Sequence, residues 1–260
     1  MLWVIQENIG NEGKFVSLID NIEKFGQRIT LVKVVPFVGE IIPDIDTDDS
    51  VICFGTYSMR KLAERKRWTP GVYDIEWFPY QRLIDALGDS VLNHDATFGN
   101  FGDILPTEDE FFIRPTHDGK EFAGKLMSSN QLKEWQHRII NLKLQDNGTM
   151  LSEHTEVMCA NIKKIYNEFR FFVVGGKAVT GSQYKLGKRV VYSNADDMLY
   201  IAQEFVDRLI PDINQPYVLD LALTDDGYKV IELNTLNCSG FYACDMQKLV
   251  STLIAYEENK

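Results

Sequence analysis

The first hundred residues alternate between two spacings of hydrophobic positions. Short apolar runs at 2–5, 28–35 and 50–54 are typical of buried strands. Apolar residues at helical spacing fill 14–25, and a further helix is predicted to start at Thr56, which can cap it. This order of strands and helices predicts a small, largely parallel α/β unit. The unit contains neither GxGxxG nor a GxxxxGKS/T loop, so the sequence supports neither a dinucleotide fold nor a P-loop.

The second half of the chain changes character and predicts hairpins with a few helices. A domain boundary is expected near Pro106, after a loosely patterned stretch that contains two glycines. Two glycines at 175–176 separate two alternating runs and are typical of a hairpin turn. The expected elements are strands at 110–114 and 149–155, helices at about 129–140, 195–209 and 243–256, and hairpins at 168–184 and 217–234. The second half is therefore expected to be α+β with antiparallel hairpins.

Charge and composition narrow the function classes. The chain has 27 Lys and Arg against 38 Asp and Glu, a net charge of -11, and so acidic a surface repels a phosphate backbone. The four cysteines and four histidines are scattered, without the closely spaced pairs of a structural zinc site. A charge interrupts the N-terminus before an apolar signal region forms, and no apolar run approaches the ~20 residues of a membrane span. We therefore expect a cytoplasmic protein that binds neither nucleic acid nor membrane.

The segment 217–234 carries the strongest chemical signal. Its Asp-Asp-Gly sequence at 225–227 fits a three-residue hairpin loop, in which a type I turn is followed by a glycine in the left-handed region. Counting back from this loop pairs Asp220 with Glu232, and directly opposed residues share a face with Cβ atoms about 5 Å apart. Because side chains alternate along a strand, Asn234 joins the same face. Three oxygen-bearing side chains thus meet on one face of a hydrophobic hairpin.

This pair of opposed carboxylates favours a metal site. Two carboxylates repel each other and cost stability unless a cation lies between them. Together with the Asn234 carbonyl, Asp220 and Glu232 offer the hard oxygen donors that suit Mg²⁺. The alternative is a half-exposed hairpin with one solvated carboxylate. A two-residue turn at 226–227 would also shift the register and move Asp220 away from the face of Glu232.

The spacing Asp-(x)11-Glu-x-Asn, followed by a Cys-Ser-Gly loop, resembles the C-terminal metal-binding segment of the ATP-grasp superfamily. In that family the Asp, Glu and Asn hold one or two Mg²⁺ on the ATP phosphates. The resemblance therefore implies metal ligation by Asp220, Glu232 and Asn234. The small loop that follows helps to bind the acceptor substrate in the family, which implies substrate contacts at Ser239 and Gly240.

Upstream segments resemble the lid and the adenine hinge of the same superfamily. The strand 111–115 ends in Arg-Pro where the family usually has Lys-Pro, so Arg114 stands in for that Lys, as in a clade of small ATP-grasp proteins. The segment 118–125 resembles the glycine-bearing phosphate loop, in which Lys120 supplies a mobile charge; an ordinary solvated turn is the alternative. Glu153 lies where the family's hinge meets the adenine amino group, and a solvated edge strand is the alternative.

The strand 168–174 resembles the Glu-x-Arg strand of the family. There the Glu is close to the ribose or adenine and the Arg contacts the transferring phosphate, which implies these roles for Glu168 and Arg170. Alternation places both side chains on one face, and the alternative is a same-face ion pair, which is worth little on a surface. Lys185 follows the return strand and either anchors a substrate carboxylate, as a candidate catalytic group, or belongs to a solvated basic loop. Tyr242 is expected in the core.

The resemblance covers roughly residue 111 to the C-terminus and implies an ATP-grasp fold of mixed α/β and α+β class. Three parts are expected: an N-terminal α/β domain at 1–105, a lid subdomain at 106–160, and an antiparallel-sheet subdomain for metal and substrate at 161–260. The implied activity is ATP-dependent carboxylate–amine ligation with Mg²⁺, through an acyl phosphate and with release of ADP and phosphate. The implied partners are small-molecule or peptide carboxylates and amines.

Two other functions fit the same sequence. A phosphotransferase that acts on hydroxyls or other groups is compatible, because fold and nucleotide site do not fix the acceptor. A nucleotide-binding interaction module without turnover is a third interpretation, and the full set of candidate metal ligands counts against it. The oligomeric state is open, although many relatives of this size pair as homodimers.

Overall fold

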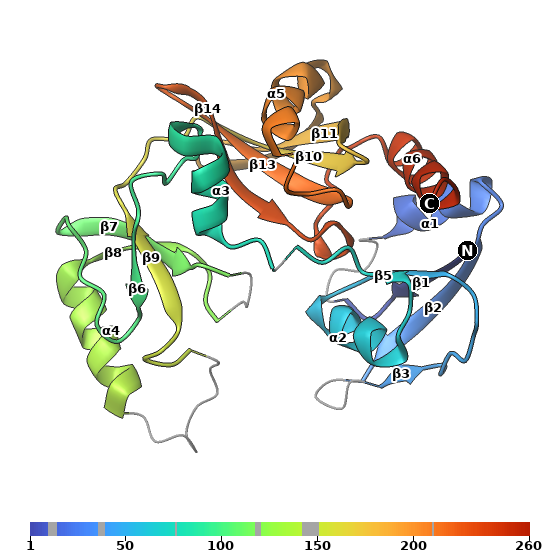
Figure 1. Ribbon diagram of the computed structural model, residues 1–260, viewed down its shortest axis with the longest axis horizontal. Coiled ribbons are helices and arrows are strands. Elements are labelled where there is room, and N and C mark those ends of the chain that lie inside the picture. The colour runs from blue at the N-terminus through green and yellow to red at the C-terminus, as the bar shows by residue number, and fades with distance from the viewer. Residues whose placement is uncertain (10–14, 36–39, 76, 118–120, 142–150, 210) are drawn as a thin grey trace. The chain divides into compact units, whose positions relative to one another are not determined.

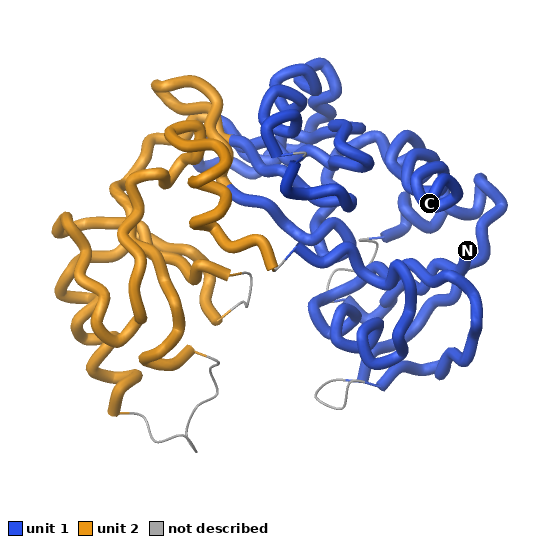
Figure 2. Tube along the Cα trace, viewed as in Figure 1, with its two compact units in different colours: residues 1–75, 167–221, 232–260 blue, residues 76–166, 222–231 orange. Residues whose placement is uncertain are grey.

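In the computed structural model the chain groups into two compact units (Figure 1). The first unit comprises residues 1–75, 167–221 and 232–260, and the second comprises 76–166 and 222–231 (Figure 2). The structure describes residues 1–9, 15–35, 40–75, 77–117, 121–141, 151–209 and 211–260. Each unit is assembled from segments that are far apart in the sequence. The domain boundaries expected from the sequence stay a prediction.

The first unit begins with a mainly parallel sheet in the order β3-β2-β1-β4-β5. Every residue of the central strand β1 (Leu2–Gln6) is buried, as expected for a parallel strand covered on both faces. Its companions are β2 (Arg28–Val34), β4 (Val51–Phe54) and β5 (Pro70–Gly71) in parallel, the antiparallel β3 (Ile41–Ile42), and the helices α1 (Val16–Lys24) and α2 (Tyr57–Lys66). The small, largely parallel α/β unit predicted from the apolar runs is confirmed.

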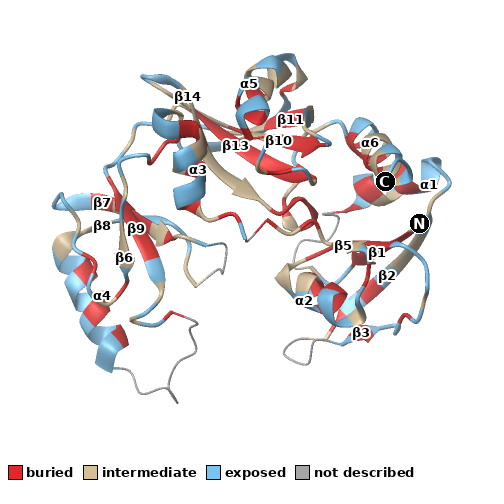
Figure 3. Cartoon of the chain, in the orientation of Figure 1, coloured by how far each residue is buried: buried red, intermediate tan, exposed pale blue. Residues whose placement is uncertain are grey.

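A second sheet, in the order β12-β11-β10-β13-β14, contains both predicted hairpins. Its strands are β10 (Asn167–Val174), β11 (Lys177–Leu186), β12 (Arg189–Asn194), β13 (Tyr217–Thr224) and β14 (Gly227–Asn234). Gly175 and Gly176 form the first turn with positive φ angles of 57° and 73°, which explains two glycines in succession. β13 is buried along most of its length, as the red colour in Figure 3 shows. The residues of this sheet up to 221 and from 232 belong to the first unit.

The sheets of the first unit share one hydrophobic core, to which two helices contribute. Leu18 of α1 and Leu249 of α6 (Met246–Glu258) belong to the same buried cluster as Phe172 of β10 and Val218 of β13. α6 begins at Asp245, whose side chain accepts a hydrogen bond from the backbone N–H of Lys248 at 3.0 Å. The predicted helix at 195–209 is divided into a 3₁₀ turn, η2 (Asp196–Met198), and α5 (Leu199–Leu209).

The second unit contains a four-stranded sheet in the order β6-β9-β7-β8. Its elements are β6 (Thr97–Asn100), β7 (Glu110–Pro115), β8 (Lys125–Ser128), β9 (Glu156–Ala160), the helices α3 (Tyr80–Leu87) and α4 (Ser129–Asn141), and the 3₁₀ turn η1 (Gly88–Ser90). Phe101, Phe122 and Trp135 meet edge to face inside this unit, with ring centroids 4.7–6.4 Å apart. The predicted strand at 110–114 and the helix that follows it are confirmed.

The strand expected at 149–155 is wrong over the part that the structure describes. Residues 149 and 150 lie outside the described residues, and 151–155 form a turn ahead of β9. The Thr155 hydroxyl accepts a hydrogen bond from the backbone N–H of Ser152 at 3.0 Å. The backbone N–H of Thr155 donates to the carbonyl of Ser152 at 3.1 Å. Such local bonds from Ser and Thr side chains compete with strand pairing, so the strand starts only at Glu156.

Among the described residues, no helix is both long and apolar enough to cross a membrane.

Candidate active site

A cluster of two carboxylates and one amide lies where β13 and β14 adjoin. The Asn234 side-chain amide donates to Asp220 Oδ2 and to Glu232 Oε1, each at 3.1 Å. The turn between the strands has Asp225 and Asp226 at its tip, and Gly227 follows with φ of 87°, in the left-handed region that the predicted loop requires. The structure therefore brings together the three residues that the sequence placed on one face.

Arg170 on β10 forms a two-pronged ion pair with Asp220. Its Nε donates to Oδ1 at 2.8 Å and its Nη2 to Oδ2 at 2.7 Å, and Nη1 also donates to the carbonyl of Gly240 at 3.4 Å. The side chains of Arg170 and Asp220 are only 11% and 2% exposed. A parallel pair of N–H···O bonds is the strongest arrangement of these groups and fixes the guanidinium plane. The predicted phosphate-binding cation and the predicted metal ligand are thus held in direct contact.

The environment of this pair shifts both acid–base equilibria. Burial raises the pKa of the Asp220 carboxyl; Arg170 opposes the rise and the nearby Glu232 carboxylate adds to it. Burial disfavours the charged guanidinium, but the Asp220 carboxylate outweighs this and raises the pKa of Arg170. The guanidinium therefore stays charged, and it is the cation that makes a buried Asp220 carboxylate tolerable.

Glu168 has other partners than Arg170. Its Oε2 accepts from the Tyr184 hydroxyl at 2.9 Å, and its Oε1 pairs with Lys185 Nζ at 2.5 Å. The β10–β11 register shifts between Glu168 and Phe169, as in a β-bulge, because Tyr184 is an extra residue on β11 between their partners Lys185 and Gln183. The same-face ion pair considered from the sequence is therefore replaced by two separate pairs. Lys185, which the sequence left between a substrate anchor and a solvated loop, is fixed by Glu168.

Three tyrosines stack beside these ion pairs, and the sequence interpretation missed their arrangement. The ring of Tyr242 lies between those of Tyr184 and Tyr192, with centroid distances of 5.2 and 5.1 Å and interplanar angles of 21° and 16°. Tyr242 is 41% exposed, so the expectation that it belongs to the core is wrong. Tyr184 and Tyr192 lie in a polar segment, 177–194, that contains no Asp or Glu. This polar context was the sequence signal that these aromatic rings do not belong to the core.

The loop after β14 carries the predicted substrate contacts Ser239 and Gly240 and follows the 3₁₀ turn η3 (Leu236–Cys238). Ser239 is buried and its hydroxyl donates to the carbonyl of Thr235 at 2.9 Å, which fixes the loop on itself. A Cβ atom at Gly240 would lie 3.3 Å from the ring of Tyr242, so a glycine lets that ring pack against the loop. Their contacts with a substrate stay a prediction.

The remaining predicted residues belong to the second unit. The Arg114 guanidinium lies 5.5 Å from the centroid of the Tyr80 ring, and its Nε donates to the carbonyl of Pro115 at 3.2 Å. Lys120 lies outside the described residues. Glu153 occurs in the turn before β9, where its Oε1 is 3.3 Å from Nε2 of His154. The nucleotide contacts expected of these three residues stay predictions.

The donor set at the cluster fits Mg²⁺ with bound phosphates rather than an all-protein metal cage. Among the described residues, no group of three or more His, Cys, Asp and Glu is arranged to hold a metal ion. Asp220 and Glu232 supply two carboxylates, and Mg²⁺ is commonly held by one or two carboxylates together with substrate phosphates and waters. The Asn234 amide donates its NH₂ to both carboxylates, and a cation would instead need its carbonyl oxygen.

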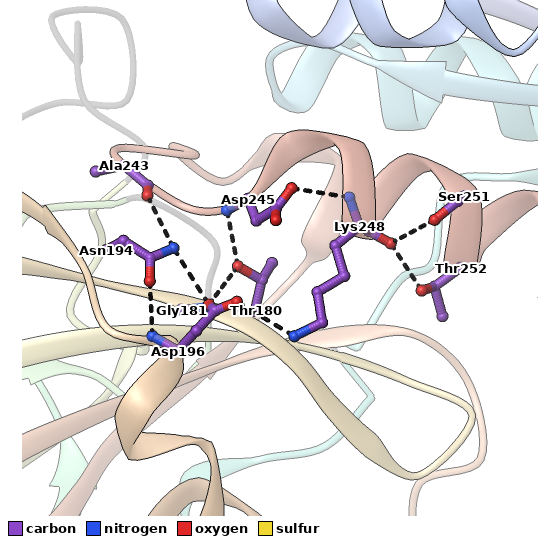
Figure 4. A network of polar contacts seen from close by, with 9 residues as sticks. All are labelled: Thr180, Gly181, Asn194, Asp196, Ala243, Asp245, Lys248, Ser251 and Thr252. Atoms are coloured by element: carbon purple, nitrogen blue, oxygen red, sulfur yellow. Dashed lines mark hydrogen bonds and ion pairs between the residues drawn. The ribbon is translucent and has the colours of Figure 1, made fainter.

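A second polar network holds the backbone next to Tyr242 (Figure 4). Asn194 Nδ2 donates to the carbonyl of Ala243 at 3.5 Å, and the backbone N–H of Asp245 donates to the Thr180 hydroxyl at 2.8 Å. Asp196 accepts from the same hydroxyl at 2.7 Å, from the N–H of Gly181 at 3.0 Å and from Lys248 Nζ at 3.2 Å. The start of α6 is thereby tied to β11.

Replacing Asp196 with Asn is expected to lower the free energy of unfolding by about 2 kcal/mol at pH 7, because a charged acceptor of several hydrogen bonds is lost. Burial alone would raise the pKa of Asp196, but the bonds from Thr180 and Gly181 hold it below its ordinary value of 3.8. The contribution is thus complete above pH 3.8 and disappears as the pH falls through the lower folded-state pKa. Urea unfolding of wild type and variant at several pH values measures this.

The matched control for this prediction is Asp197→Asn, which changes an exposed carboxylate next to Asp196. It is expected to leave the unfolding midpoint unchanged. An equal loss in both variants would contradict the role of the Asp196 network and indicate a general charge effect.

Comparisons with known proteins bear on the family and the fold of this chain. A family model described as an ATP-grasp domain, family 3 of its clade, matches residues 42–253. D-cycloserine synthetase DcsG matches in structure with a TM-score of 0.66 and 12% identity, over 100% of this chain and 99% of that one. The ATP complex of D-alanine–D-alanine ligase from Bacillus anthracis has a TM-score of 0.63 and 11% identity, over 99% and 97% of the chains.

A third similar structure is the ATP-grasp ligase PsnB, in complex with precursor peptide PsnA2 and AMPPNP. Its TM-score is 0.57 and its identity 13%, over 98% of this chain and 96% of that one. No curated protein matches the chain in sequence. At these identities the structural likenesses establish the fold alone, which is the mixed α/β architecture expected from the sequence.

Proposed function

Because the chain belongs to a family of ATP-grasp domains, we propose that it is an ATP-dependent carboxylate–amine ligase. The observation that carries the proposal is the Asn234 amide joining the Asp220 and Glu232 carboxylates, next to the buried Arg170. In the proposed reaction a substrate carboxylate oxygen attacks the γ-phosphorus of ATP and ADP leaves. An amine then attacks the acyl carbon, phosphate leaves, and the amine nitrogen loses a proton.

The structural relatives support this class of reaction. They are named as a synthetase and as ligases, and their names refer to D-cycloserine, D-alanine and a precursor peptide. Amino acids and peptides are therefore the substrate classes that we propose for this chain. Ligation is favoured over phosphoryl transfer because these relatives are named as ligases or as a synthetase.

The residues of the cluster receive distinct tasks in this proposal. Asp220, Glu232 and Asn234 would hold Mg²⁺, which supplies neutralisation of the negative charge on the ATP phosphates. Arg170 stabilises the transferring phosphoryl group, since its guanidinium is fixed in plane and stays charged. Glu168 orients Lys185, whose ammonium group we assign to the substrate carboxylate.

The loop after β14 and the second unit complete the proposed assignments. Ser239 and Gly240 are assigned to the acceptor because they directly follow the carboxylate cluster. Arg114 and Lys120 are assigned to the ATP phosphates, and Glu153 to the adenine. The assignments of Arg114, Lys120 and Glu153 rest on the family pattern and on the charge of each side chain.

The proposal predicts that Mg-ATP and a small-molecule filtrate of cell extract together yield ADP and phosphate, whereas either one alone does not. Added hydroxylamine is expected to trap a hydroxamate, because it attacks an acyl phosphate. Nucleotide products are measured by ion-exchange chromatography and hydroxamates by their ferric complexes.

The products separate the alternatives. AMP as the product would contradict the acyl-phosphate route. ADP formation with no hydroxamate, together with a phosphorylated small molecule, would establish a phosphotransferase. Addition of EDTA is expected to stop ADP formation, and its restoration by Mg²⁺ serves as the control.

A further inference from the structure

The tyrosine stack is built from three separate segments of the first unit. Tyr184 comes from β11, Tyr192 from the edge strand β12, and Tyr242 from the loop that follows Ser239 and Gly240. The rings repeat at 5.2 and 5.1 Å and are nearly parallel. Stacked aromatic pairs are stable when their centroids lie about 4.5–7 Å apart, so this is a favourable ladder that presents further ring surface at its end.

Tyr242 is held in an unfavourable backbone conformation. Its φ angle is +52°, in the left-handed region that side chains other than glycine rarely adopt. Its neighbour Ala243 is fixed on both sides, because its N–H donates to the Ser182 hydroxyl at 3.2 Å and its carbonyl accepts from Asn194. A strained residue persists when its surroundings fix it in this way, and such residues cluster at ligand sites.

The tyrosine stack is also adjacent to Arg170, the cation proposed to stabilise the transferring phosphoryl group. The Arg170 guanidinium carbon lies 5.7 Å from the Tyr184 ring centroid and 5.2 Å from that of Tyr242. Arg170 therefore lies beside the rings of Tyr184 and Tyr242. Tyr192, an outer ring of the stack, is 61% exposed and offers an accessible aromatic surface.

We propose that the exposed ring of Tyr192, which is backed by Tyr242, forms the wall of an acceptor subsite that takes a planar aromatic side chain. The amine substrate is then an aromatic amino acid, or a peptide that begins with one. A flat ring continues the ladder at the same spacing, which a branched aliphatic side chain of similar size cannot do. This inference rests on the proposed function.

The test compares two probes that differ in planarity but hardly in size: racemic phenylalanine and racemic cyclohexylalanine, each free and as the amino-terminal residue of a dipeptide with glycine. Binding is measured by isothermal titration in the presence of Mg-AMPPNP. Phenylalanine is expected to bind about two- to tenfold more tightly, from the usual strength of aromatic stacking. Tyr192→Leu is expected to abolish this difference, and Tyr192→Phe to retain it.

Tyr200→Leu is the matched control, since Tyr200 is a 66% exposed tyrosine on α5 that takes no part in the stack. It is expected to preserve the preference for phenylalanine. The inference is overturned if the two probes bind equally, if neither binds, or if Tyr192→Leu keeps the preference. Glu232-dependent ADP formation from the cell filtrate tests the proposed function separately, so a failed aromatic preference with intact turnover refutes the subsite alone.

Discussion

Replacing Glu232 with Gln is expected to lower ATP turnover by about 10²- to 10³-fold. Gln has almost the same shape and can still accept a hydrogen bond from Asn234 Nδ2, so the polypeptide loses one negative charge and little else. That charge is one of the two carboxylates proposed to hold Mg²⁺ on the ATP phosphates, and charge stabilisation in a reacting centre has effects of this size. Turnover is measured as ADP formed with the small-molecule filtrate.

Stability and charge controls make this result specific. The unfolding midpoint of the Glu232→Gln variant is expected not to fall below that of the wild type, because the amide keeps the shape and the hydrogen bond from Asn234 and removes a charge that repels the buried Asp220 carboxylate. Glu204→Gln, which removes an exposed carboxylate from α5, is expected to keep full turnover. Wild-type turnover in the Glu232→Gln variant would show that the metal assignment is wrong.

The second large effect is expected on stability. Replacing Arg170 with Met should lower the free energy of unfolding by about 3–5 kcal/mol, because it leaves the Asp220 carboxylate buried without its cation. The aliphatic stem is largely retained, so lost packing contributes little. Urea unfolding followed by circular dichroism at pH 7 measures the change.

Two further measurements identify the cause of that loss. The double variant Arg170→Met with Asp220→Leu is expected to regain most of the stability, since replacing both members of a buried ion pair by apolar groups is often neutral or stabilising. If the double variant is as unstable as the single one, loss of packing rather than an unpaired charge is responsible.

The pH dependence of the single variant has a definite sign. Burial raises the pKa of Asp220 above its ordinary value of 3.8, and in the variant the Arg170 guanidinium no longer opposes this rise. The folded state then binds a proton that the unfolded state releases, so stability relative to wild type falls as the pH rises from 3.8 through the folded-state pKa. Below pH 3.8 the carboxyl is protonated in both states, and this part of the cost disappears. A gap between variant and wild type that does not narrow in acid would contradict this account.

Local sequence patterns were sufficient to predict the main elements and the carboxylate cluster. Apolar runs and helical spacing predicted the parallel α/β unit at the N-terminus, because periodicity reports which side of each element is buried. The turn chemistry at 225–227 and the two-residue period of a strand placed Asp220, Glu232 and Asn234 together. Both are short-range rules, and the residues concerned lie on one hairpin.

The way in which the hairpins meet became visible only in the folded chain. Arg170 and Asp220 are fifty residues apart and pair because β10 and β13 are neighbours in the sheet, an order that no local pattern encodes. Glu168 pairs with Tyr184 and Lys185 of the neighbouring strand, where the register shifts, and not with Arg170 as in the ion pair considered as an alternative. Such a bulge places one extra residue in one strand of a pair, so it depends on how both strands align in the sheet.

The tyrosine stack shows the same limit of local patterns. The local sequence around Tyr184 and Tyr192 does not indicate that their rings stack. The local sequence around Tyr242 suggested a core residue. They meet because β11 and β12 are paired and because Asn194 and Ser182 fix the loop beside them. Stacking depends on distances between rings from different segments, and those distances exist only once the chain has folded.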